Sequence, residues 1–119
     1  INYDAIQFSV TPDNYQIEAI AGLNYEFENK KKECYQEMEK IFDEIKLLFP
    51  NSKTVKEKES SHEADESGKS VGKIYRIDLN NGVIRVTCTD WAKKMSHTDS
   101  LKISIHTTEH IDWINNEAY

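Results

Sequence analysis

The dipeptide Asn81-Gly82 lies between two runs of alternating apolar residues, which is the strongest short-range signal for a β-hairpin. A two-residue type I′ turn needs positive φ angles, and Asn and Gly adopt these angles most readily. We therefore place Asn80 opposite Val83. The register then pairs Leu79 with Ile84, Ile77 with Val86 and Tyr75 with Cys88 on an apolar face, and Asp78 with Arg85 and Arg76 with Thr87 on a polar face.

Three more segments alternate in the same way and predict strands. Residues 5–10 and 15–23 flank the turn residues 11–14 and should form a hairpin, with Gly22 at a bulge or strand end. Residues 100–106 place Leu101, Ile103 and Ile105 on one face and should extend the sheet of the Asn81-Gly82 hairpin.

Apolar residues at spacings of three and four between positions 29 and 49 predict one long amphipathic helix, which Pro50 should end. Its apolar stripe consists of Cys34, Met38, Ile41, Phe42, Ile45, Leu48 and Phe49. A short terminal helix, capped by Thr107 or Thr108, should carry Ile111, Ile114 and Ala118.

Residues 51–70 hold only Val55 and Ala64 as apolar side chains, so this segment is expected to be a flexible loop. The length of 119 residues suits a single domain, 1–119, with one core. The prediction is an α+β fold: a mainly antiparallel sheet of about five strands, the long helix on one face and a short C-terminal helix. The order is strand, strand, helix, loop, three strands, helix.

The net charge of −6 comes mainly from residues 1–50, which carry ten acids against five lysines. Such a balance argues against nucleic-acid binding, which needs clustered Lys and Arg. It suits a basic protein partner, with Glu37, Asp43 and Glu44 on the long helix as candidate interface residues. No apolar stretch approaches the roughly 20 residues of a membrane span.

The chain begins at Ile1 instead of Met, so we expect a preceding segment to have been removed. A signal peptide or lipoprotein leader there would make the protein periplasmic or secreted, and a lipid anchor on that segment is an open alternative. A cytoplasmic protein is the other alternative.

Cys34 and Cys88 both fall on apolar faces that should meet in one core, so a disulfide is expected between them. It would close a loop of 53 intervening residues. In the chain-entropy model this closure stabilises the fold by roughly 4 kcal/mol. The alternative is two separate buried thiols.

Catalytic, metal and cofactor signatures are weak. A cysteine hydrolase would need Cys88 beside His97 and Asp90 or Asp99, but the inward strand position of Cys88 predicts poor access. His106 and His110 lie four apart without a third ligand at a telling spacing, so we expect exposed histidines and no metal. The glycines fit no phosphate-binding loop, and no cofactor is predicted.

Trp91 and Trp113 are the largest apolar side chains and are candidate interface residues, with core packing as the simpler alternative. The leading hypothesis is a non-enzymatic protein-binding module, an exported inhibitor, immunity or accessory protein. The alternatives are a small cysteine hydrolase built on Cys88 and an intracellular regulatory or phage-type protein with reduced core cysteines.

Overall fold

The computed structural model describes residues 2–116 and contains seven strands and two α-helices within them. The elements are β1 (Ala5–Val10), β2 (Ile17–Asn24), α1 (Lys31–Lys46), β3 (Lys53–Lys56), β4 (Ser60–Ser61), β5 (Val71–Leu79), β6 (Gly82–Asp90), a 3-10 turn (Lys93–Met95), β7 (Ser100–Thr107) and α2 (Thr108–Asn116). Ala118, which the sequence assigned to the last helix, lies outside the described residues.

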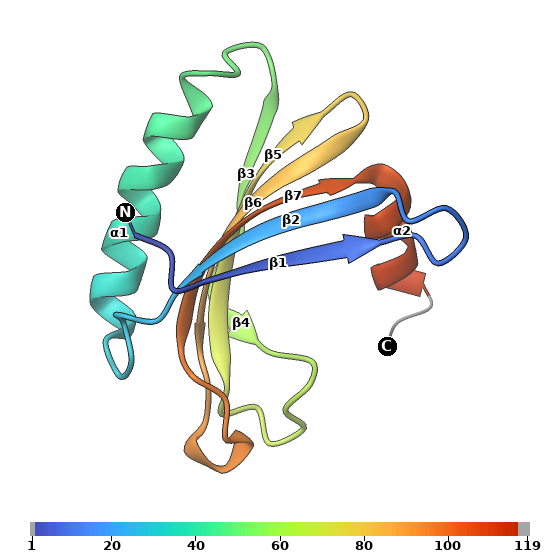
Figure 1. Ribbon diagram of the computed structural model, residues 1–119. Coiled ribbons are helices and arrows are strands. Elements are labelled where there is room, and N and C mark those ends of the chain that lie inside the picture. The colour runs from blue at the N-terminus through green and yellow to red at the C-terminus, as the bar shows by residue number, and fades with distance from the viewer. Residues whose placement is uncertain (1, 117–119) are drawn as a thin grey trace.

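All strands form one antiparallel sheet in the order β1-β2-β7-β6-β5-β3, and β4 also pairs with β5. Helix α1 packs on one face of the sheet, and α2 lies on the other side against β2 and β7 (Figure 1). The predicted α+β architecture is therefore confirmed, but the predicted number of strands is wrong: there are seven instead of five. Among the described residues, no helix is long and apolar enough to span a membrane.

The hairpin predicted around Asn81-Gly82 is present, but its predicted register is wrong. The observed pairs are Leu79 with Gly82, Asp78 with Val83, Ile77 with Ile84, Arg76 with Arg85 and Tyr75 with Val86. Asn80 and Asn81 form the turn, and neither they nor Gly82 has a positive φ angle. Each side chain nevertheless keeps its predicted face, because every pairing partner moves by two residues.

Gly82 is needed because the neighbouring strand lies close to it, and not because the turn requires a positive φ angle at this position. A Cβ at this position would lie 2.4 Å from the carbonyl oxygen of His106 on the neighbouring strand β7. Gly22 has a related role inside β2, where a Cβ would meet the ring of Tyr3 at 2.4 Å. Gly22 is therefore not at a strand end. The irregularity of this hairpin lies near Ser9 and Val10 instead.

The expected loop over residues 51–70 contains regular structure, which corrects the prediction. Strand β3 pairs with β5 from Lys53 opposite Asp78 to Lys56 opposite Tyr75, and β4 pairs with β5 further along. An edge strand gains its main-chain hydrogen bonds without needing many apolar side chains, so the polar composition of this segment did not reveal it.

The core lies between α1 and the facing side of β5, β6 and β7. Its buried members are Cys34, Met38, Ile41, Phe42, Tyr75, Ile77, Ile84, Val86, Cys88 and Leu101. The helix ends at Lys46, and two further turns lead to Pro50. Leu48 is 74% exposed and does not belong to the buried stripe, because the helix ends before it.

Candidate functional site

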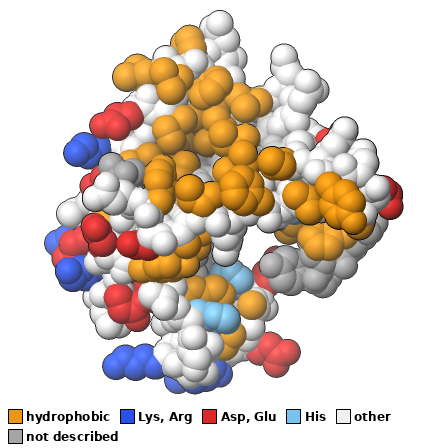
Figure 2. Space-filling view, in the orientation of Figure 1, with side chains coloured by type: hydrophobic (Ala, Val, Ile, Leu, Met, Phe, Trp, Pro, Cys, Tyr) orange, Lys and Arg blue, Asp and Glu red, His pale blue; other side chains and the backbone are white. Residues whose placement is uncertain are grey.

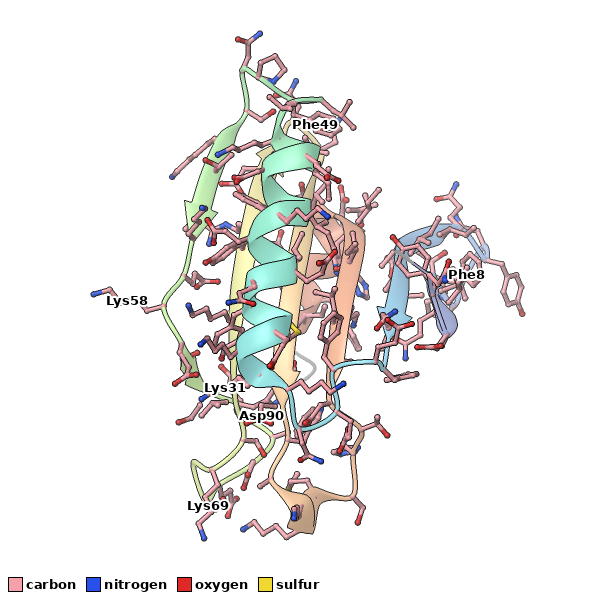
Figure 3. The ribbon with its side chains drawn as sticks, turned by 90° about the vertical axis from the view of Figure 1, so that its left-hand side faces the viewer. Phe8, Lys31, Phe49, Lys58, Lys69 and Asp90 are labelled. Atoms are coloured by element: carbon pink, nitrogen blue, oxygen red, sulfur yellow. A yellow bond between two sulfur atoms is a disulfide. The ribbon has the colours of Figure 1, made fainter. Side chains whose placement is uncertain are left out.

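The structure joins Cys34 on α1 to Cys88 on β6, with an S–S distance of 2.05 Å and a Cα–Cα distance of 6.1 Å (Figure 3). Both residues are buried in the core. The pair connects the helix to a central strand of the sheet. Both cysteines of the chain lie within the described residues and neither is free.

The residues of the cysteine-hydrolase hypothesis do not surround a free thiol. The Asp99 carboxylate is buried and accepts the backbone N–H of Asn29 (2.9 Å) and of Trp91 (2.7 Å). Burial and a hydrogen bond to Asp99 raise the pKa of Asp90. The Asp99 carboxylate therefore joins the loop before α1 to the loop after β6.

Trp91 is half-buried between two histidine rings, His62 at a centroid distance of 4.4 Å and His97 at 4.6 Å. The adjoining 62–70 segment is held by Asp65, whose carboxylate accepts the hydroxyl groups of Ser67 (2.7 Å) and Ser70 (2.6 Å). These contacts give Trp91 a structural role at this end of the sheet.

His106 and His110 are buried, so the expectation that they are exposed is wrong. Their rings stack at 5.2 Å, since α2 folds back over the face of β7 that carries His106. The Nε2 atom of His106 lies 2.7 Å from Ser104 Oγ, and Nδ1 of His110 lies 3.4 Å from Glu18. The described residues contain no group of three or more side chains able to hold a metal ion.

The acidic side chains of α1 divide between two flanks of the helix. On the flank towards β3, Glu39 pairs with Lys56, and Tyr35 donates to Glu59. Helical geometry, at about 100° per residue, places Glu37 and Glu44 on the opposite flank, towards β7 and β2. Neither forms an ion pair within residues 2–116, whereas Asp43 pairs with Lys46 at 3.1 Å.

An apolar face of the sheet extends beyond the reach of α1 and is exposed. Its members, which we call the apolar face, share the side of the sheet that α1 covers elsewhere. They are Ile6, Phe8, Val10, Ile17, Ile20 and Ile105, all between 45% and 61% exposed. Figure 2 shows a broad hydrophobic patch over the upper part of the molecule.

The width of the sheet explains why this face stays uncovered. A helix is about 10 Å across with its side chains, while neighbouring strands lie about 4.8 Å apart. One helix therefore covers only two or three strands, and α1 lies over β5, β6 and β7. The β1–β2 hairpin, with Phe8, stands to one side of the helix (Figure 3).

The apolar face borders a hollow of about 480 Å³ at the end of the sheet near the β5–β6 turn. Its lining includes Ile17, Ile20, Leu79, Ile105 and the turn residues Asn80 and Asn81. Trp113 on α2 is 50% exposed. Sequence reasoning missed the apolar face because it treated every alternating strand as covered.

A comparison of the chain with known protein families, curated proteins and solved structures finds no match. The fold defines an α+β protein with a wide antiparallel sheet, a long helix on one face and a short helix on the other.

Proposed function

We propose that this chain is a non-enzymatic protein-binding module that docks a partner on the apolar face. The exposed row formed by Phe8, Ile20 and Ile105 carries the proposal. Ile20 pairs with both of the others across β1, β2 and β7, so the three side chains are contiguous. A contiguous exposed apolar surface is costly in water and is typical of protein interfaces.

The charge around this face selects the kind of partner. Glu37 and Glu44 lie on the flank of α1 towards the apolar face, and the whole chain carries a net charge of −6. Complementary charge steers association and penalises like-charged surfaces. We therefore propose that the partner is a different protein, whose contact surface has an apolar centre and a basic rim, in preference to a second copy of this acidic chain.

An exported setting is part of the same proposal. The Cys34–Cys88 pairing supports it, because disulfides persist mainly in oxidising compartments. The same pairing disfavours a hydrolase that depends on a Cys88 thiolate. Inhibitor, immunity and accessory proteins are the classes that act through such a surface without chemistry of their own.

Photo-crosslinking tests the docking surface in cells that make the protein. A photoreactive benzoylphenylalanine replaces Phe8 in one variant and Gln36, on the outward side of α1, in a control variant. We expect a crosslinked protein from position 8 only. That protein is then purified, and its binding should weaken at least about tenfold in Phe8→Ser and Ile20→Ser.

Two further measurements decide between occupants. Glu37→Gln and Glu44→Gln should slow association at low salt, whereas Glu66→Gln, in the distant 62–70 segment, should leave it unchanged. If position 8 crosslinks only to another copy of this chain, and sedimentation shows a dimer, a second copy and not a basic partner occupies the apolar face. Equal binding by all variants would reject the apolar face as the site.

A further inference from the structure

The face of the sheet away from α1 carries a second unassigned cluster, independent of the apolar face. In the β6–β7 register, Arg85 stands opposite Ser104 and Thr87 stands opposite Lys102. Residues two apart on a strand share a face, so these four side chains form a square. The two cations occupy one diagonal of the square and the two hydroxyl groups occupy the other.

The cations of this square have no carboxylate at ion-pair distance in the part of the chain that the structure describes. Neither Arg85 nor Lys102 forms an ion pair within residues 2–116, and the buried Nε of Arg85 makes no hydrogen bond there. Arg76, opposite Arg85 on β5, is already paired with Asp78 at 3.1 Å. Glu57 is the nearby carboxylate that acts on Arg85, from outside ion-pair distance.

Among the described residues, the remaining groups around the square add little negative charge. His106 hydrogen-bonds to Ser104 and stacks on His110, and Glu18 lies beside His110. Burial lowers the pKa of Arg85 and of Lys102, so holding both charges here costs free energy. A chain of net charge −6 thus keeps side by side two partly buried cations that have no ion-pair partner within residues 2–116.

We propose that Arg85, Lys102, Thr87 and Ser104 bind a doubly charged oxyanion of the phosphate or phosphate-monoester class. Facing Cβ atoms on paired strands lie about 5 Å apart and alternate residues about 7 Å apart, which suits one tetrahedral group. Arg and Lys would neutralise its charge, and the hydroxyl groups would donate hydrogen bonds to its oxygens.

The site is open to a small ligand. Arg85, Thr87 and Lys102 are each partly exposed, while Ser104 is buried. On the right of Figure 2, which is the side away from α1, the surface is hollowed between the lobe that contains α2 and the lower part of the molecule. The phosphate-sized group would therefore reach the sheet from this side.

The test follows the Arg85 Nε–H signal by NMR while inorganic phosphate or glycerol 3-phosphate is added at constant ionic strength. We expect a saturable shift with a Kd of about 1 mM or tighter, shared by the amides of residues 85–87 and 102–104. Stronger binding of glycerol 3-phosphate would identify a phosphate carried by an organic molecule. Equal binding would identify free phosphate.

Variants remove one cation at a time. Lys102→Gln should weaken binding at least about tenfold, and the matched control Lys40→Gln, on the exposed side of α1, should leave it unchanged. If Arg85→Gln does not fold, Arg85→Lys takes its place because it keeps the positive charge. The Arg85→Lys variant should bind phosphate more weakly than the parent protein, because the forked pair of guanidinium donors is lost. The site would be rejected if chloride caused the same NMR shift as phosphate. It would also be rejected if both Lys102→Gln and Arg85→Lys bound phosphate with the affinity of the parent protein.

Discussion

Asp65 accepts two hydrogen bonds from Ser70, one from its backbone N–H at 3.0 Å and one from its hydroxyl group at 2.6 Å. The same carboxylate accepts two more from Ser67. These bonds close the 62–70 segment on itself, and Ser70 Oγ in turn accepts the N–H of Ala92. A polar segment is thus ordered by one carboxylate instead of by apolar burial.

The first prediction concerns this carboxylate. Hydrogen bonds from Ser70 and Ser67 lower the pKa of Asp65, so its stabilisation is present above the ordinary Asp pKa, about 3.9, and is lost at lower pH. Asp65→Asn should speed hydrogen exchange of the Ser67 and Ser70 amides at neutral pH. Glu66→Gln, which removes the same charge from an exposed neighbour, should not. Equal exchange in both variants would contradict the proposed role of Asp65.

The second prediction concerns the disulfide. Denatured protein from an oxidising compartment should take up two alkylating labels only after reduction. Cys34→Ala combined with Cys88→Ala should lower the free energy of unfolding by about 4 kcal/mol, measured by urea denaturation. Two labels without reduction would remove the support for export and favour the intracellular hypothesis with reduced cysteines.

The third prediction concerns pH and His106. Burial, with the nearby charges of Arg85, His110 and Lys102, lowers the pKa of His106 to about 4. The unfolded chain, with an ordinary His pKa of about 6.5, binds this proton first, so stability is complete above about pH 6.5 and falls towards pH 4. The loss should reach about 3 kcal/mol.

Urea denaturation across this pH range measures the loss. His106→Gln should flatten the dependence, and His97→Gln, at an exposed position, should leave it as steep as in the parent protein. A parent profile that is flat between pH 6.5 and pH 4 would show that the His106 pKa is not lowered.

The fourth prediction separates the observed hairpin register from the one expected for an Asn-Gly turn. Gly82→Ala should cost more than about 1 kcal/mol, because the new methyl group meets the carbonyl oxygen of His106. Asn81→Ala should be nearly neutral, since Asn81 lies in the turn without a positive φ angle. If Asn81-Gly82 formed a type I′ turn, both substitutions would lower the free energy of unfolding. Chemical denaturation of the two variants therefore distinguishes the two registers.

The sequence revealed the elements whose side chains repeat regularly. The stripe from Cys34 to Ile45 predicted α1, because burial on one side imposes a helical period. The alternation of Ile6, Phe8 and Val10 predicted β1, although this side of the strand is exposed. Thr107 was correctly named as a cap: its Oγ1 accepts the N–H of His110 at 3.2 Å. Local chemistry was enough for each of these features.

Features that depend on strand order were beyond local patterns. The square of Arg85, Thr87, Lys102 and Ser104 exists only because β7 lies beside β6. The exposure of Ile105 depends on where α1 stops covering the sheet. The hydrophobic pattern of the helix or of the strand does not predict this limit. Strands β3 and β4 form by backbone pairing with β5, and the hydrophobicity of their side chains says little about this pairing.

The bond between Cys34 and Cys88 makes the middle of the chain a closed covalent ring, with two linear arms attached to it. The ring contains most of α1, the strands β3, β4 and β5, and most of β6. A protease that cuts one peptide bond between the two cysteines opens the ring without releasing a fragment. Such nicked molecules would keep both arms and both proposed binding surfaces, and they would separate into two pieces only when an electrophoresis sample is reduced.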